Sequence, residues 1–260
     1  MTNIYFYILA IIFGLCWGSF LTVVIWRIDD LKSIFTTRSR CTNCNREIRW
    51  FDLIPIISYG ILRGRCRHCK EKIPSLYPAI ELLAGAVVLL TYINYGLSWQ
   101  GLIIFILFST LIITLGYDAL HMMIVDAVIW FGVALAIFWQ IMQILGGDWK
   151  SIVFSLVIGI AVGLGIPLVM VLTSHSRWMG EGDIVLGLLA GMLVGFPKIL
   201  VAYIIAFAVG AIYGISLIIL RRGRMKDAVP FGPFLVVGTI IAFFIGQAIV
   251  DWYLRINLLI

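Results

Sequence analysis

Aspartates stand at the ends of long apolar runs in this chain of 260 residues. Asp118 follows the run LIIFILFSTLIITLGY, and Asp183 follows Gly180 and Gly182 in the sequence GEGD, where another apolar run begins. A third aspartate, Asp126, comes eight residues after Asp118. Ionisable side chains at membrane depth are unfavourable and usually functional, so these aspartates are the first candidates for chemistry.

Two carboxylates that face each other in a site of low polarity do not both ionise easily, because each disfavours the charge on the other. The ionised aspartate can take a proton from a water molecule that attacks an amide carbonyl. The protonated aspartate can polarise that carbonyl and protonate the leaving amine. Asp118 and Asp183 are therefore predicted to form a proteolytic pair, with Gly180 and Gly182 giving an extended substrate close access.

Two other interpretations of these aspartates are open. Asp183 can be a structural cap of its helix, with the two glycines forming an ordinary loop. The aspartates can also form an ion or proton pathway in a transporter, although their position at one face argues against a pathway through the bilayer midplane. Asp126 is a candidate for supporting the pair or for capping the next helix.

Four cysteines form two pairs with the same internal spacing, Cys41 with Cys44 and Cys66 with Cys69. Each CxxC can present two thiolates to one tetrahedral ion, and the 21 residues between the pairs give a spacing close to that of a zinc ribbon. The sequence thus predicts a structural zinc site. Two disulfides, or reduced cysteines without metal, are the alternatives.

The elements that must position these residues are apolar helices. Hydrophobic residues make up 62% of the chain and occur in long runs, whereas soluble domains average nearer half. Runs of about 20 apolar residues are typical of transmembrane helices. The sequence predicts an all-α polytopic membrane protein with about eight transmembrane helices, at approximately 4–26, 77–96, 99–117, 122–145, 151–173, 183–196, 198–220 and 231–250. The sixth run is short and meets Pro197, so 183–220 is alternatively one broken hairpin.

The net charge of +6 is a signal of membrane topology and not of nucleic-acid binding. Eleven of the 19 lysines and arginines lie between Arg27 and Lys72, and four more lie in RRGRMKD from Arg221 to Asp227. Because positive loops stay cytoplasmic, the N-terminus is predicted to lie outside the inner membrane, and the three aspartates at its cytoplasmic side. The cysteines are then in a reducing compartment, which disfavours disulfides.

The chain is predicted to divide into a first transmembrane helix (1–26), a cytoplasmic four-cysteine domain (27–76) and a transmembrane aspartyl peptidase domain (77–260). The four-cysteine domain is too small to bury a sizeable core, so it needs a staple such as a metal ion. Glu81, early in the second predicted helix, is expected to pair with a basic residue of the four-cysteine domain.

Five motifs in a fixed order make the chain resemble the bacterial prepilin peptidases, the bifunctional leader peptidase and N-methyltransferase enzymes of type IV pilus, type II secretion and competence systems. The first is GSFLTVVIWR from Gly18 to Arg27, and the second is the cysteine segment with its IRWFDLIPIISYGILRGRC core. The remaining motifs are DALHMMIVD, GEGD and FGPFL. The likeness runs nearly from end to end.

This resemblance implies that Asp118 and Asp183 are the aspartyl protease pair and that the zinc-binding residues are Cys41, Cys44, Cys66 and Cys69. It implies prepilin or pseudopilin substrates, which have a short basic leader, then Gly, then usually Phe and an apolar helix. Enzymes of this family cut after the Gly on the cytoplasmic side and methylate the new N-terminal amine with S-adenosylmethionine.

Three positions depart from the family pattern. Thr22 stands where the family commonly has Asn, Val125 where it has Pro, and Val185 where it has Lys. Both aspartates remain, so peptidase activity is expected. Methyltransferase activity rests on the resemblance and the intact cysteine segment, because no glycine-rich loop marks a methyl-donor site. The alternatives are a peptidase without methylation, a transporter with a zinc-binding regulatory loop, and a catalytically silent assembly scaffold.

Overall fold

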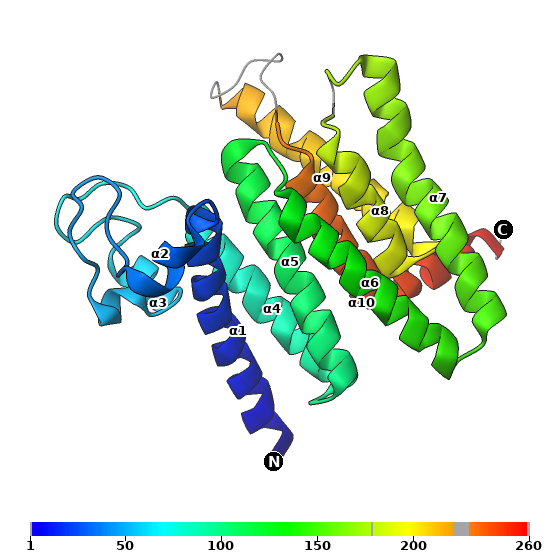
Figure 1. The fold of residues 1–260 in the computed structure, drawn as a ribbon, viewed down its shortest axis with the longest axis horizontal. Helices are drawn as coiled ribbons and strands as arrows, with labels where there is room; N and C mark the ends of the chain where they lie inside the picture. Colours follow the sequence, from blue (N-terminus) through cyan, green and yellow to red (C-terminus); the bar gives the residue numbers. More distant parts are fainter. Residues whose placement is uncertain (1, 178, 221–228, 259–260) are drawn as a thin grey trace. The chain divides into compact units, whose positions relative to one another are not determined.

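The computed structural model describes residues 2–177, 179–220 and 229–258, and this part of the chain is helical (Figure 1). The basic stretch RRGRMKD lies outside the described residues. The helical elements are α1 (Thr2–Arg27), α2 (Leu31–Thr36), η1 (Trp50–Leu53), α3 (Ile57–Ile61), α4 (Leu76–Tyr95), α5 (Trp99–His121), α6 (Asp126–Gly146), α7 (Trp149–Ser174), α8 (Gly182–Val194), α9 (Lys198–Ile219) and α10 (Gly232–Leu258).

Seven of these helices are long and apolar enough to cross a membrane: α1, α4, α5, α6, α7, α9 and α10. The prediction of an all-α polytopic membrane protein is confirmed, but α8 has only 13 residues. It is about 20 Å long, whereas the hydrocarbon core of a bilayer is about 30 Å thick. Helix α8 ends early because Gly195 adopts a positive φ of 64° and Pro197 has no backbone N–H to continue the helix.

The chain divides into two compact units, one up to Gly116 and one from Tyr117 onward. In the first unit, small residues let α1 and α4 approach closely. A Cβ atom added to Gly14 would lie 2.8 Å from the Cα of Gly85, and one added to Gly18 would lie 2.7 Å from the Cα of Glu81. The glycine of the GSF motif therefore keeps the end of α1 against the beginning of α4.

In the second unit, α7 and α8 pack side by side through glycines (Figure 1). Gly163 of α7 lies against the backbone of Gly187 and Gly191 of α8. Pro167, inside α7, cannot donate to the carbonyl of Gly163 four residues earlier. The buried hydroxyl of Tyr203, from α9, donates to that carbonyl instead at 2.5 Å. Glycine packing thus holds α8 against α7, and this hydrogen bond joins α9 to α7.

Replacing Gly163 with Ala is expected to destabilise the second unit. The new methyl group would overlap the carbonyl oxygen of Gly187, and overpacking of this kind costs about 1–3 kcal/mol. Gly165→Ala, on the same helix, is the matched control, because within the described ranges no atom lies within 4 Å of the added Cβ. Thermal unfolding in detergent measures both. An equal fall in Tm for the two variants would contradict the packing explanation.

Candidate active site and metal centre

Asp118 lies in the last turn of α5, and Asp183 lies in the first turn of α8. Both are buried, with 6% and 8% of their surfaces exposed, and their carboxylates are close enough to interact electrostatically. Ile124, in the loop after α5, packs on Gly182, where an added Cβ would lie 3.1 Å from the Ile124 Cβ. The structure thus brings together the end of one helix and the beginning of another.

The carboxylate of Asp183 is held by the turn that precedes α8. The backbone N–H of Gly180 donates to its Oδ2 at 3.1 Å, and the N–H of Asp183 donates to the carbonyl of Gly180 at 3.1 Å. The N-cap of α8 is Glu181, so Asp183 does not occupy the cap position itself. Gly180 is exposed, and among the described residues a Cβ added to it would meet Asp183 Oδ2, at 3.8 Å.

Gly232 is a site residue to which the sequence analysis gave no role. It begins α10, and the carboxylate of Asp118 lies so close to it that an added Cβ would overlap Oδ2. Leu186 packs on the same spot, where the added Cβ would be 3.4 Å from its Cδ2. The FGPFL motif was the available signal, because it contains Gly232 and was already part of the family resemblance.

No basic side chain in the described ranges forms an ion pair with Asp118 or Asp183. Val185, which stands where the family pattern has a lysine, is half-buried and directly precedes Leu186. The groups found next to the pair include the backbone N–H of Gly180 and the side chain of Leu186. In such surroundings one carboxylate retains a proton more easily than both ionise.

Asp126 lies outside this buried pair of aspartates. It is the exposed first residue of α6, whose N-cap is Val125, and no hydrogen bond between Asp126 and the two buried aspartates is found in the described part of the chain. An acidic residue in the first turn of a helix interacts favourably with the helix dipole, which accounts for its position in α6.

The four cysteines converge on one point in the first unit. Their sulfur atoms lie within 4.8 Å of one another, and the Sγ atoms of Cys41 and Cys69 are 3.8 Å apart without a disulfide. Four Zn–S bonds of about 2.3 Å in a tetrahedron place the sulfurs about 3.8 Å apart, so the cluster fits zinc. The backbone N–H groups of Cys44 and Asn43 lower the pKa of the Cys41 thiol to about 7, which favours the thiolate that a metal needs. The backbone N–H of Glu71 lowers the pKa of the Cys69 thiol, but burial and the three neighbouring thiols outweigh it and raise this pKa to about 11, because the four sulfurs disfavour one another's charge unless a cation lies between them.

The two halves of the cysteine cluster have the same local structure. The N–H of Cys41 donates to Arg46 O at 3.0 Å, and that of Cys66 donates to Glu71 O at 2.8 Å. Arg67, in the second half, donates to Asp52 of η1 at 2.6 and 2.9 Å, and its hydrogen bonds lower the pKa of that carboxyl. The Arg67–Asp52 pair connects η1 to the half of the segment that contains Cys66 and Cys69. Its two parallel hydrogen bonds allow only one relative orientation of the two side chains.

Glu81 differs from its expected pairing. It is 7% exposed, and its Oε2 accepts the backbone N–H of Ile56 at 2.8 Å. Among the described residues it has no ion pair with a basic side chain of the four-cysteine segment. A backbone amide has taken the place of the expected cation.

Two protein families match this chain in sequence. Residues 12–95 match the Bacterial Peptidase A24 N-terminal domain, and residues 105–215 match the Type IV leader peptidase family. The chain is 28% identical to a prepilin leader peptidase/N-methyltransferase of Bacillus subtilis, over 95% of this chain and 97% of that protein. It is 28% identical to one of Aeromonas salmonicida, over 96% and 94%.

A relative from Escherichia coli, named a type 4 prepilin-like proteins leader peptide-processing enzyme, is 31% identical over 90% of this chain and 91% of its own length. No solved structure gives a significant match. The similarity covers both compact units, including the cysteine cluster and both buried aspartates. The chain is therefore a multi-pass membrane protein that belongs to the type IV leader peptidase family.

Proposed function

We propose that this protein is a membrane-embedded aspartyl endopeptidase that removes the leader peptide of prepilins or pseudopilins after Gly. The observation that carries the proposal is the meeting of two buried carboxylates, Asp118 and Asp183, with no basic partner among the described residues. Membership in a leader peptidase family supplies the substrate class.

In the proposed reaction, water attacks the carbonyl of the scissile bond between the two carboxylates. The ionised aspartate accepts the proton of the water, and the protonated one donates to the carbonyl and then to the leaving amine. Gly180 holds Asp183 Oδ2, which leaves Oδ1 for water or substrate. We propose that an extended substrate passes beside the exposed Gly180, that Gly182 permits the tight packing on Ile124, and that the exposed Asp126 supports the pair without direct contact.

We assign the protein to the bacterial cytoplasmic membrane, with the N-terminus outside and the aspartates and four-cysteine segment in the cytoplasm. The support is the concentration of basic residues between Arg27 and Lys72, since positively charged loops are retained in the cytoplasm. The leader of the prepilin then stays in the cytoplasm while its apolar helix lies in the bilayer.

The proposal includes a second activity, N-methylation of the new N-terminal residue with S-adenosylmethionine. Its support is that relatives matched over nearly their full length are named leader peptidase/N-methyltransferase. Zinc is proposed to bind Cys41, Cys44, Cys66 and Cys69 as a structural ion, because four convergent thiolates saturate a tetrahedral site and leave no open position for catalysis.

Co-expression with a prepilin tests the proposed function. The intact mass of the pilin is expected to fall by the mass of the leader up to its Gly and to rise by one methyl group. Loss of the leader without the methyl group would restrict the protein to peptidase activity. If several different prepilins all kept their leaders, the result would contradict the proposal and favour the transporter or scaffold interpretation.

Replacing Gly232 with Ala is expected to lower kcat for cleavage about 100-fold. The new methyl group cannot coexist with the Asp118 carboxylate in its present position, and a displacement of about 1 Å at a catalytic group has an effect of that size. Gly214→Ala in α9 is the control, because no atom of the described residues lies within 4 Å of its added Cβ. Initial rates on a prepilin peptide measure both, and equal rates would remove Gly232 from the site.

A further inference from the structure

Large apolar side chains lie exposed on the segment between α1 and α4, outside the seven long apolar helices. Trp50 of η1 is 78% exposed, and Ile57 and Ile61 of α3 are 60% and 71% exposed. The two isoleucines are four residues apart, so they lie on one face of α3, and η1 is in contact with this helix. We refer to these three residues as the apolar patch. Exposed apolar side chains that gather in this way mark an interaction site.

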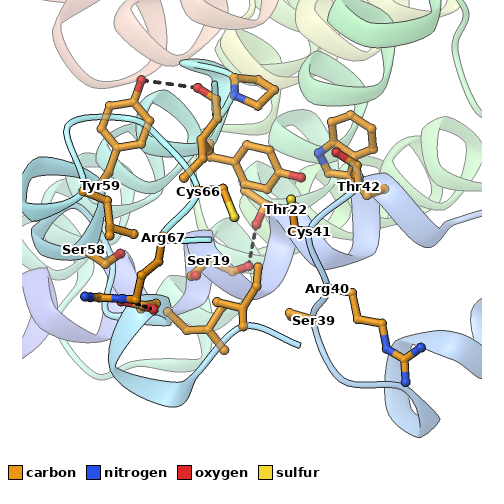
Figure 2. Close-up of a pocket in the computed structure, with 18 of the residues that line it drawn as sticks. Ser19, Thr22, Ser39, Arg40, Cys41, Thr42, Ser58, Tyr59, Cys66 and Arg67 are labelled. Atoms are coloured by element: carbon orange, nitrogen blue, oxygen red, sulfur yellow. Dashed lines mark hydrogen bonds and ion pairs between the residues drawn. The ribbon is translucent and has the colours of Figure 1, made fainter. Parts of the chain in front are cut away.

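The other face of α3 is turned towards α1. Tyr59 lies almost opposite to residues 57 and 61 around the helix axis. It lines a cavity of about 340 Å³, and Figure 2 shows it in this cavity together with Ser58 of α3 and with Ser19 and Thr22 of α1. The isoleucines of the apolar patch therefore point away from the interior of the first unit.

The segment does not extend freely from the end of α1 but lies back along the membrane helices. The N–H of Ile56, directly before α3, donates to Oε2 of Glu81 at 2.8 Å, and Glu81 packs against Gly18 of α1. Gly18 precedes the end of α1 at Arg27 by nine residues, or about 13 Å. With the length of the glutamate side chain allowed for, Ile56 lies about two helical turns short of that end.

This depth corresponds to the inner edge of the headgroup region of a bilayer. Helix α1 has 26 residues and is about 39 Å long, close to the thickness of about 40–45 Å that a bilayer has with its headgroups. Its last two turns therefore cross the headgroups, and α3 begins where the acyl chains begin. Tryptophan is enriched at this boundary, and exposed isoleucines are stabilised where they leave water.

The residues that flank the apolar patch are basic. Arg49 directly precedes Trp50, and Arg63 follows Ile61 by two residues; both arginines are exposed, and neither forms an ion pair within the described ranges. From Arg27 to Lys72 the chain has eleven basic residues and five acidic ones. A second copy of this chain would bring the same sign of charge and be repelled, and so would the basic leader of a prepilin. Anionic lipid headgroups have the complementary charge.

We propose that the apolar patch is buried in the cytoplasmic leaflet of the membrane, with Arg49 and Arg63 on the headgroups of anionic phospholipids. The inference rests on the proposed topology, in which this basic segment is cytoplasmic, and it goes beyond the proteolytic and methyltransferase activities. Such an element combines apolar insertion with electrostatic attraction to anionic lipids. The four-cysteine segment is then held at the membrane surface in three places, by α1, by α4 and by the apolar patch.

Photocrosslinking of the full-length protein tests this contact. The zinc-loaded variants Ile57→p-benzoylphenylalanine and Ile61→p-benzoylphenylalanine are placed in nanodiscs with equal amounts of phosphatidylglycerol and phosphatidylcholine, and after irradiation the intact mass identifies the attached lipid. Both positions are expected to form lipid adducts and to favour the anionic phosphatidylglycerol about fivefold or more, because one arginine near the surface contributes about that factor. Arg49→Gln together with Arg63→Gln is expected to lower this preference below about twofold.

Three controls are matched to these variants. Leu9→p-benzoylphenylalanine, 58% exposed on α1 in a stretch of 26 residues without lysine or arginine, is expected to react with both lipids about equally. Asn43→p-benzoylphenylalanine, in an exposed turn of the cysteine cluster, is expected to form few lipid adducts. Arg38→Gln with Arg40→Gln removes the same charge from residues that are paired with Glu47, and should leave the lipid preference unchanged. Zinc content and Tm verify the folding of every variant.

The proposal would be overturned if positions 57 and 61 formed no lipid adducts while position 9 did, if position 43 reacted as well as they did, or if the two arginine pairs changed the lipid preference equally. Crosslinked dimers in place of lipid adducts would assign the apolar patch to a second copy and also overturn it. Should neither isoleucine variant fold, Trp50→p-benzoylphenylalanine replaces one aromatic residue with another and tests the same patch. Prepilin cleavage is measured separately, because the lipid contact stands or falls whether or not the leader is removed.

Discussion

Replacing Asp183 with Asn is expected to lower the rate of prepilin cleavage about 10³-fold or more, and Asp118→Asn to have a similar effect. Asn has nearly the same size, and its carbonyl oxygen can still accept the N–H of Gly180 at the position of Oδ2. It cannot take up the proton of the attacking water or donate a carboxyl proton. The chemistry is lost while the packing of α8 is kept.

Single-turnover cleavage of a purified prepilin in detergent measures this loss. Because the two aspartates act as one unit, the double variant is expected to be no slower than the slower single variant. Asp251→Asn, whose exposed carboxylate accepts from Gln247 at 2.9 Å, is the control and should cleave at the normal rate. Normal cleavage by either single variant of the pair would contradict the paired mechanism.

Replacing Cys66 with Ser is expected to release the metal and unfold the four-cysteine segment between α1 and α4. That segment contains only short helices, and large apolar side chains such as Phe35 and Trp50 remain 84% and 78% exposed. It therefore has little core of its own, and a structural zinc site contributes about 10–16 kcal/mol of apparent binding free energy in small domains. Acidification is expected to act in the same direction, because protons compete with zinc for the thiolates.

Metal analysis and limited trypsin digestion measure the effect of Cys66→Ser. Wild-type protein should hold one zinc ion per chain and resist cleavage at the arginines of the segment. Cys16→Ser is the matched control, because Cys16 is exposed on α1 and outside the cluster. A Cys66→Ser protein with a full complement of zinc and the same digestion pattern would show that the segment folds without a four-thiolate site.

The long helices could be predicted because the length and hydrophobicity of an apolar run carry the physical information that the membrane requires. The limit appears at α8, where the predicted run to residue 196 ends at Val194. Pro197 indicated that the helix is interrupted near this residue. It did not indicate that α8 ends before Gly195, which adopts a positive φ. The structural repeat of the cysteine segment was also present in the similar strings RCTNCNRE and RCRHCKEK.

The partners of the buried acids could not be predicted from local sequence. Gly232 has no side chain to signal its role, and only the folding of α10 against the end of α5 brings it to Asp118. Glu81 bonds to a backbone N–H that every residue except proline has, so nothing in the residue type of Ile56 indicates the contact. Such partners are determined by long-range packing, which cannot be inferred from hydrophobic periodicity or from motif spacing.

The glycine register between α7 and α8 sets how far Asp183 lies from the end of α7. Gly163 faces Gly187 and Gly191, so Asp183 lies between the levels of Pro167 and Val171, about 8 Å short of the end of α7 at Ser174. Two or three extended residues span a distance of about 8 Å, whereas a helix needs about five residues for it. We therefore expect cleavage to depend on how easily a chain unwinds next to its cleavage point. A leader joined to its helix through glycine, a poor helix former, unwinds there at low cost.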